Sequence, residues 1–89
     1  MRHQLEIILG EELRFLAIKT RERLGLTQKA MGERLQMSES SYSDIETGRY
    51  RCSALTTTLL LNMQDDPGDF LQKLETKFAK WYETEMLTI

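Results

Sequence analysis

The sequence has few of the residues on which disulfide-bonded, zinc-binding or hairpin-rich proteins depend. Its 89 residues include one cysteine (Cys52), one proline and five glycines. A lone cysteine cannot form a disulfide within the chain or build a zinc site, and scarce proline and glycine argue against a fold of β-hairpins. We therefore expect one small all-α domain, with Cys52 as a partly buried apolar residue rather than a reactive thiol.

Long hydrophobic segments are also missing. The run at residues 59–61 is far too short to span a bilayer, and the run at residues 5–9 is interrupted by Glu6. We expect neither a membrane segment nor a secretory signal. A cytoplasmic location is the resulting expectation, and the single cysteine is compatible with it.

Side chains for catalysis or cofactor binding are equally scarce. His3 is the only histidine and lies near the N-terminus, so the sequence supports no Ser–His or Cys–His pair. The glycines are scattered and form no phosphate-binding loop, and the sequence contains no spacing typical of metal ligands. We expect no enzymatic activity, no cofactor or metal, and no small-molecule ligand.

The charges are distributed unevenly along the chain. The net charge is −2, but residues 19–51 hold seven basic and five acidic side chains, whereas the remainder holds five basic and nine acidic ones. The positive segment can face nucleic acid. Two solvated faces without a partner explain the same pattern, and charge alone does not choose between these interpretations.

Apolar residues at spacings of three and four predict five helices. The predicted helices span residues 3–24, 27–36, 38–47, 53–64 and 67–86. Residues that can cap a helix precede four of them, namely Thr27, Ser38, Ser53 and Asp66. Gly25 and Gly48 stand where helices commonly end in a left-handed residue. Because Gly10 interrupts the first pattern, residues 1–12 are either a separate arm or the start of the first helix.

Residues 26–48 form the most distinctive stretch, two short helices joined by a tight turn. The residues that share the inner faces of these helices are Met31, Leu35, Tyr42 and Ile45. Gly32 costs about 1 kcal/mol inside a helix, but a small residue there lets the next helix cross closely. These features predict a helix-turn-helix.

This stretch resembles the helix-turn-helix of the phage-repressor and Cro-like proteins, the XRE family. The matching residues are Thr27, Gln28, Met31, Gly32, Leu35, Ser38, Ile45, Glu46 and Gly48. The resemblance covers roughly residues 13–66 and implies a five-helix, lambda-repressor-like, all-α domain whose relatives commonly bind operator DNA as dimers. Residues 67–89 lie beyond it and form an amphipathic C-terminal helix that packs on the domain or in a dimer.

The second helix of such a motif presents its N-terminal part to base edges in the major groove. The residues at those positions are Glu39, Ser40, Ser43 and Asp44, and the resemblance implies base readout by the same four. Carboxylates accept from cytosine N4, and serines bond to several bases. Alternatively, Glu39 and Asp44 are ordinary solvated helix residues, and Glu39 also suits the first turn, where the helix dipole favours an acid. Base readout and a solvated surface therefore both stay open for these two residues.

A second set of residues can contact the DNA backbone. It consists of Gln28, Lys29, Arg34, Arg49, Tyr50 and Arg51. Gln28 at a helix start can bond a phosphate, as the resemblance also implies, and helix capping is the alternative. For the others an ordinary solvated surface is the alternative. The resemblance further implies a structural pair of Arg21 with Glu46, which would fix the third helix to the first.

Two residues of the motif depart from the family pattern. Gln36 stands where the turn usually has glycine, which requires a left-handed glutamine. Tyr42 replaces a branched aliphatic residue, and its hydroxyl needs a partner or access to solvent.

Beyond the motif, the last helix carries an apolar stripe that can either pack in the core or join two copies of the chain. The stripe comprises Phe70, Leu71, Leu74, Phe78, Trp81 and Tyr82.

Taken together, these patterns predict a homodimeric transcription regulator that binds double-stranded operator DNA sequence-specifically, with repression the commoner outcome in the family. The alternative is a protein-interaction module, such as an antirepressor or partner-binding regulator, that keeps the fold without binding DNA. The acidic balance of the chain and the carboxylates of Glu39 and Asp44 favour this alternative.

Overall fold

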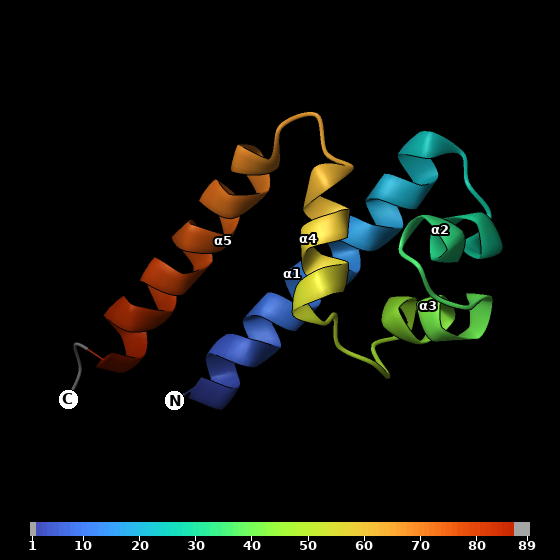
Figure 1. Ribbon diagram of the computed structural model, residues 1–89. Helices are drawn as coiled ribbons and strands as arrows, with labels where there is room; N and C mark the ends of the chain where they lie inside the picture. Colours follow the sequence, from blue (N-terminus) through green and yellow to red (C-terminus); the bar gives the residue numbers. More distant parts are fainter. Residues whose placement is uncertain (1, 87–89) are drawn as a thin grey trace.

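The computed structural model describes residues 2–86, in which there are five α-helices and no strand. α1 spans Arg2–Leu24, α2 Gln28–Arg34, α3 Glu39–Glu46, α4 Ala54–Asn62 and α5 Pro67–Trp81 (Figure 1). A π-helical segment, Tyr82–Met86, continues α5. The predicted five-helix, all-α fold is confirmed. Met1 and residues 87–89, which belong to the predicted terminal segments, lie outside the described residues.

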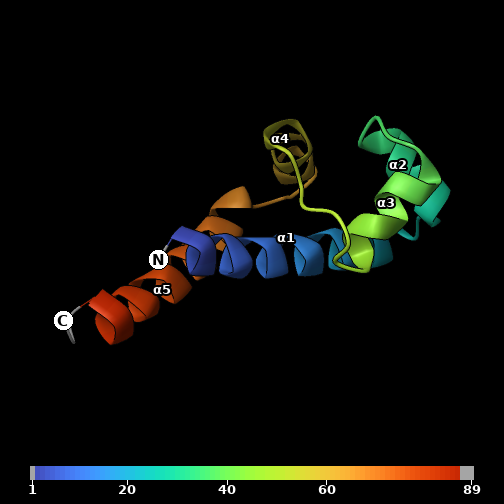
Figure 2. The ribbon, with the colours of Figure 1, turned by 90° about the horizontal axis from the view of Figure 1, so that it is seen from below.

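Helix α1 is the element to which the others attach. It continues through Gly10 without a break, so residues 2–12 are its first turns rather than a separate arm. Helices α3, α4 and α5 each pack on it, and Figure 2 shows α2 and α3 gathered near its C-terminal end with α4 to one side. Its buried residues, Leu13, Ala17 and Thr20, are spaced by four and three, as one helix face requires.

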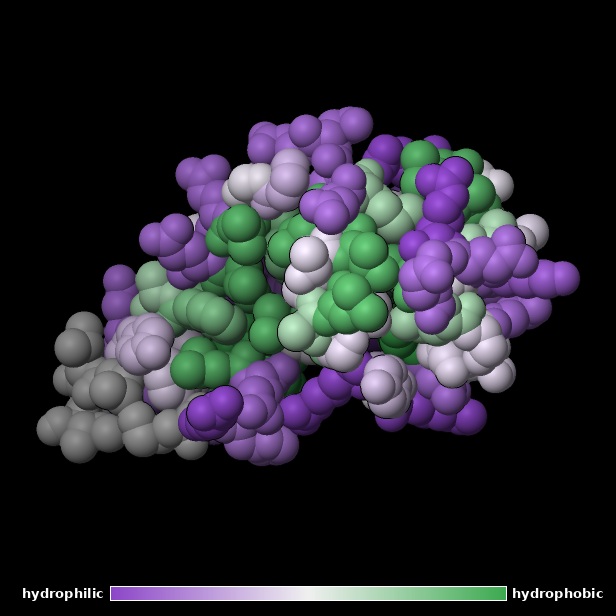
Figure 3. All heavy atoms as spheres, in the orientation of Figure 1, coloured by the Kyte–Doolittle hydropathy of each residue, from purple (hydrophilic) through white to green (hydrophobic). Residues whose placement is uncertain are grey.

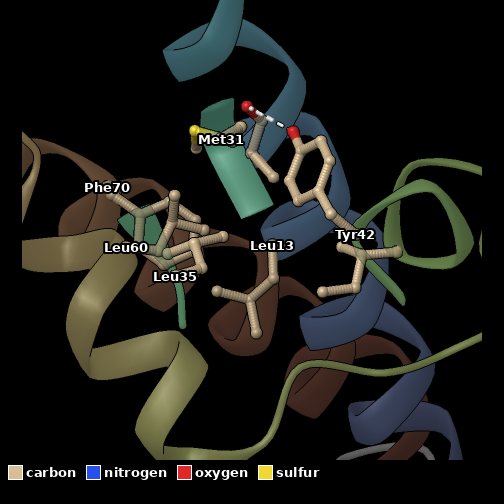
Figure 4. Packing of buried hydrophobic residues seen from close by; sticks show 8 residues of the cluster. Leu13, Met31, Leu35, Tyr42, Leu60 and Phe70 are labelled. Atoms are coloured by element: carbon tan, nitrogen blue, oxygen red, sulfur yellow. Dashed lines mark hydrogen bonds between the residues drawn. The ribbon is translucent and has the colours of Figure 1, made fainter. Parts of the chain in front are cut away.

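All five helices contribute to the hydrophobic core, shown in Figure 4. Its buried apolar members are Leu13, Ala17, Met31, Leu35, Tyr42, Ile45, Leu60 and Phe70. This set includes every residue that the sequence assigns to the inner faces of the helix-turn-helix. The motif is therefore held by packing against α1 and not by its own two short helices alone, which are too short to be stable in isolation.

The turn between α2 and α3 depends on a residue without a side chain. A Cβ at Gly32 would lie 3.0 Å from the backbone oxygen of Met37 and 3.1 Å from that of Ser38. Both neighbours are backbone atoms, so the whole turn would have to move to accommodate a larger residue. The close approach of the turn thus explains why a glycine is placed in the interior of a helix.

Gln36 adopts the left-handed conformation expected for its position in the turn, with φ at 61°. A residue with a Cβ pays about 1–2 kcal/mol for this conformation, offset in part by a 3.2 Å bond from Gln36 Nε2 to the Glu33 carbonyl oxygen. We expect Gln36→Gly to raise the free energy of unfolding by about 0.5–1 kcal/mol, as measured by urea denaturation. Gln36→Val should lower it, and a destabilised glycine variant would contradict the expectation.

Three of the four predicted helix caps are present. The hydroxyl oxygens of Thr27, Ser38 and Ser53 accept from the backbone N–H groups of Ala30, Ser41 and Thr56 at 3.1, 3.2 and 3.1 Å. Asp66 occupies the N-cap position of α5, with Pro67 in the first turn as predicted, but its side chain makes no capping hydrogen bond. The N–H of Asp69, which such a cap would use, donates to the backbone oxygen of Asp66 instead, at 3.1 Å.

Helix α5 lies along the N-terminal half of α1 (Figures 1 and 2). Of its apolar stripe, Phe70 is buried, Leu74, Phe78 and Trp81 are half-buried, and Leu71 and Tyr82 are exposed. Lys77 forms an ion pair with Glu12, and Trp81 Nε1 donates to Gln4 Oε1 at 2.8 Å. Most of the stripe therefore packs within the chain.

Helix α4 is held against α1 by one face and by its C-terminal end. Thr56 and Leu60 are buried on that face. Just beyond the helix, Gln64 Nε2 donates to Thr20 Oγ1 of α1 at 2.9 Å. The opposite face of α4 has no helix packed on it in Figure 1.

Candidate nucleic-acid interface

The beginnings of α2 and α3 together form a shallow concave surface, which we call the readout surface. Its lining residues are Gln28, Ser38, Glu39, Ser40 and Ser43. Glu39 and Ser40 are exposed, whereas Ser43 and Asp44 are half-buried. Three of the four predicted base-readout residues thus share this surface, and Asp44 follows directly after Ser43 on α3.

The readout surface offers hydrogen-bond acceptors and hydroxyl groups. Ser38 Oγ lies 3.3 Å from Ser40 Oγ and donates to Ser41 Oγ at 3.0 Å, while it also caps α3. Among residues 2–86, the carboxylate of Glu39 and the hydroxyl of Ser43 have no hydrogen-bond partner. Such groups suit the amino donors of bases, cytosine N4 above all for a carboxylate.

Gln28 is directed toward α3 in this structure. Its Nε2 donates to Glu46 Oε1 at 3.1 Å, so one of its two N–H groups is occupied within the protein. Its side-chain oxygen and second N–H have no partner in the part of the chain that the structure describes. Contact between Gln28 and a phosphate stays a prediction, and the bond to Glu46 shows what orients the side chain before any DNA is present.

Glu46, at the end of α3, connects three helices. Arg21 of α1 donates to both of its carboxylate oxygens, from Nε to Oε2 at 2.6 Å and from Nη2 to Oε1 at 3.1 Å. The hydroxyl of Tyr42 also donates to Oε2, and it lies 3.3 Å from the carbonyl oxygen of Ala17 (Figure 4). We call Arg21, Gln28, Tyr42 and Glu46 the Glu46 network. It fixes the orientation of α3 relative to α1 and α2.

The protonation states in the network follow from its geometry. Burial raises the pKa of Glu46, but the hydrogen bonds from Arg21, Tyr42 and Gln28 outweigh this and hold that pKa below its ordinary value of 4.5. Burial, reinforced by the neighbouring Glu46 carboxylate, raises the pKa of Tyr42 well above its ordinary value of 10.0. Glu46 is thus a carboxylate at neutral pH, and Tyr42 remains a hydrogen-bond donor.

The predicted backbone-contact residues fall into two groups. Lys29, Arg34 and Arg49 are exposed and have no ion-pair partner among residues 2–86, and Tyr50, which follows Arg49, is exposed too. Arg51 differs, because its Nη1 donates to Glu6 Oε2 of α1 at 2.9 Å. The structure therefore leaves three cations near the motif free for phosphates and directs Arg51 toward α1.

Comparison with protein families decides the classification of this arrangement. The family model of the helix-turn-helix domain matches residues 8–63. The chain belongs to the helix-turn-helix domain family. This family is of the XRE/Cro-like type, so the predicted membership is confirmed. No curated protein and no solved structure gives a significant match.

The match runs from α1 through α4 and ends before α5. It contains the whole readout surface and the Glu46 network. Membership in the helix-turn-helix family indicates DNA binding and a role in transcription regulation. The family match gives no description of residues 2–7 at the start of α1, nor of helix α5.

Features of other kinds of site can be assessed in the same residues. Within residues 2–86 no group of three or more His, Cys, Asp and Glu side chains is arranged to hold a metal ion. None of the helices described is both long and apolar enough to cross a membrane. Cys52 is half-buried, and burial raises the pKa of its thiol, which lowers its reactivity at neutral pH.

Sequence reasoning did not identify how Gln28 and Tyr42 join the Glu46 network. A signal for Tyr42 was present, because Tyr42 and Glu46 are four residues apart and so share a helix face. No local signal pointed to the bond between Gln28 and Glu46, since 18 residues separate them. The shared partner becomes visible only when α2 and α3 are placed together.

Proposed function

We propose that this helix-turn-helix protein is a sequence-specific, double-stranded-DNA-binding transcription regulator that acts as a dimer, with repression as its regulatory effect. The observation that carries the proposal is the readout surface, where the exposed start of α3 adjoins Gln28 at the start of α2. In DNA-bound helix-turn-helix proteins, the second helix reads bases from the major groove and the first crosses the backbone. The proposed site of action is the cytoplasm, where operator DNA would be met.

Within this proposal the residues divide by role. Glu39, Ser40, Ser43 and Asp44 read base edges, while Gln28, Lys29, Arg34, Arg49, Tyr50 and Arg51 contact the backbone. The free carboxylate of Glu39 favours a cytosine amino group at its base pair. Arg51 must release Glu6 before it binds a phosphate, so we expect it to contribute less than Arg49.

Duplex binding across a salt series tests the proposal. We expect a labelled random duplex to bind at low salt and to lose affinity steeply as salt rises, because each phosphate contact releases counterions. Arg49→Ala should reduce the slope of log affinity against log salt by about 1. Lys80→Ala, on the exposed surface of α5, is the matched control and should leave the slope unchanged. No duplex binding even at low salt would contradict the proposal.

Selection of bound duplexes from a random pool then tests base readout. We expect the native chain to select a defined half-site, and Glu39→Gln to relax the preference at one base pair, since a good base contact contributes about 1–3 kcal/mol of discrimination. The affinity for unselected duplexes should not fall, because the substitution also removes a negative charge near the phosphates. An identical selected sequence for both chains would show that Glu39 is only a solvated helix residue.

The second candidate function is protein interaction without DNA binding. Glu39 and Asp44 favour it, because two carboxylates near the phosphate backbone are repelled, and no lining residue of the readout surface is basic. The same salt series separates the two functions. A chain that binds no duplex at low salt but keeps its fold would favour the interaction module.

A further inference from the structure

Arg14 of α1 is a half-buried cation without a charged partner. Its guanidinium lies over the ring of Phe15, 5.2 Å from the centroid. Within residues 2–86 it makes no hydrogen bond and no ion pair. A guanidinium that is partly removed from water normally has an oxygen acceptor beside it, because such a partner offsets the free energy of desolvation. Arg14 therefore has the environment of a side chain whose partner comes from outside the chain.

The nearest carboxylate along the helix does not serve as this partner. Glu11 lies three residues before Arg14, a spacing at which opposite charges can meet on a helix. No ion pair joins the two in the part of the chain that the structure describes, and Glu11 is exposed to water. The carboxylate thus stays hydrated, and the free charge that is partly removed from water is the cation.

Arg14 lines a hollow between α1 and the loop after α3, residues 47–53, which we call the loop hollow. Its volume is about 200 Å³, roughly six times the volume that one water molecule takes up in the liquid, so a phosphate group fits. Its lining includes Arg14, Gly48, Tyr50 and Arg51. A Cβ at Gly48 would lie 3.8 Å from Cδ and Nε of Arg14, so the loop backbone lies close to this side chain. Figure 3 shows hydrophilic atoms along the lower edge of the molecule, where Figure 1 places the loop and the N-terminal half of α1.

The other charges around the loop hollow are already engaged or hydrated. Glu6 on its wall accepts from Arg2 Nε at 3.3 Å and from Arg51 Nη1 at 2.9 Å. One carboxylate shared by two arginines leaves this group with a net positive charge. An anion that enters the hollow therefore meets a free guanidinium at Arg14, and the only unpaired acid among the described lining residues is the hydrated Glu11.

Tyr50 supplies a second donor on the loop side of the hollow. Its side chain is 56% exposed, and its hydroxyl has no hydrogen-bond partner among residues 2–86. A guanidinium offers a planar set of N–H donors that matches the oxygens of a phosphate, and a phenol adds one O–H donor. Arg14 and Tyr50 together thus provide the charge and the donors that a phosphate diester requires.

The position of the loop hollow fits the edge of a DNA groove. The loop begins where α3 ends, and the eight residues of α3 place its two ends about 12 Å apart. The major groove is also about 12 Å wide. When the start of α3 reads bases, its other end therefore lies beside the sugar-phosphate backbone that borders the groove. Figure 2 shows this end of α3 next to α1.

We infer that the loop hollow binds one phosphate of the DNA backbone and that Arg14 and Tyr50 donate to it together. The inference rests on the proposed DNA-binding function and adds to it Arg14, a residue of α1 outside the helix-turn-helix motif at residues 26–48. Gln28 at the start of α2 and Arg14 beside the end of α3 then contact the backbone on both sides of α3, which fixes the orientation of α3 in the groove.

Removal of the Arg14 charge tests the inference in the duplex assay across a salt series. Arg14→Met keeps an unbranched apolar stem. We expect it to reduce the slope of log affinity against log salt by about 1 and the affinity at low salt by at least about 10-fold. Arg14→Lys keeps the charge and should retain the native slope. Circular dichroism and urea denaturation check that each variant is folded.

Lys19→Met is the matched control. Lys19 also lies on α1, is exposed and has no ion-pair partner in the described residues. Five residues separate it from Arg14, which places it about 140° away around the helix. Its replacement removes the same charge from the chain and should leave the slope unchanged. Equal losses in the two methionine variants would show that only net charge matters, and a slope lost in Arg14→Lys would show that Arg14 is structural. Either result overturns the inference.

Duplexes with a single neutral methylphosphonate linkage locate the phosphate. They are built on the half-site that the selection experiment provides. Neutralising the contacted linkage should weaken binding of the native chain, should hardly affect Arg14→Met, and should affect Tyr50→Phe less than the native chain. If the two variants lose sensitivity at different linkages, Arg14 and Tyr50 do not share a phosphate and the inference is wrong.

The loop hollow and the DNA-binding function can be judged separately in these experiments. If the native chain binds duplex and Arg14→Met keeps the native slope and affinity, the loop hollow is not a phosphate site and the DNA-binding proposal stands. If the native chain binds no duplex even at low salt, the DNA-binding proposal is wrong and the inference falls with it.

Discussion

Glu46→Ala is expected to lower the free energy of unfolding by about 3 kcal/mol, a large share of the stability of a small domain. The Glu46 side chain is only 10% exposed and accepts hydrogen bonds from Arg21, Tyr42 and Gln28. Removing it leaves a half-buried guanidinium without its counter-charge and Gln28 Nε2 without its acceptor, while the Tyr42 hydroxyl keeps only the carbonyl oxygen of Ala17, at 3.3 Å. Urea denaturation followed by circular dichroism measures the change.

Glu33→Ala is the matched control for this prediction. Glu33 lies on α2, its side chain is exposed, and it makes no side-chain hydrogen bond or ion pair in the described residues. Its replacement should change the stability by no more than about 0.5 kcal/mol. Equal effects of the two substitutions would show that the Glu46 network contributes nothing beyond the loss of one surface carboxylate.

Lowering the pH should also remove the stability that the Glu46 carboxylate contributes. Because the folded protein holds the pKa of Glu46 below 4.5, the unfolded chain binds more protons there, and stability rises with pH in that range. The contribution is complete above pH 4.5 and is lost as the pH falls through the folded value. The stability difference between the native chain and Glu46→Gln should therefore shrink as the pH is lowered below 4.5. A constant difference would contradict the role of the charge.

Local chemistry explains which parts of the fold could be predicted. The caps at Thr27, Ser38 and Ser53 use bonds that span three residues, and the left-handed Gln36 and Gly48 reflect backbone geometry within one turn. Such features depend on neighbouring residues, so the sequence contains their cause. Asp66 is at the N-cap position but makes no side-chain cap, and the N–H of Asp69 donates to its backbone oxygen.

The site could be predicted only where the helix itself positions the side chain. Glu39, Ser40 and Ser43 project from α3 as the helical period requires, and the structure places them on the readout surface. Gln28 and Arg51 depend on partners that are distant in sequence. Arg51 meets Glu6 across 45 residues, and only the path of α1 brings the two together. No periodic pattern could show that this cation is already engaged.

The packing of helix α5 likewise depends on partners that the sequence pattern does not identify. Its stripe predicted an apolar contact but left the partner open, since an amphipathic helix has the same pattern whether it covers its own domain or a second copy. The structure shows that Phe70 enters the core and lies near Leu60 (Figure 4). The family match ends at residue 63, so the helix that closes this side of the core comes from outside the matched segment.

Phe70→Ala should accordingly cost about 3 kcal/mol, although Phe70 lies outside the helix-turn-helix match. Phe70 is 8% exposed, whereas the adjacent Leu71 is 50% exposed, so Leu71→Ala is the control and should cost less than about 1 kcal/mol.

Trp81, the only tryptophan, lies on α5 and reports on that helix by fluorescence. The unfolding transition followed by Trp81 fluorescence should coincide with the loss of total helix seen by circular dichroism, because α5 unfolds together with the core that it covers. An earlier fluorescence transition in the native chain would show that α5 detaches independently and that the core is complete without it.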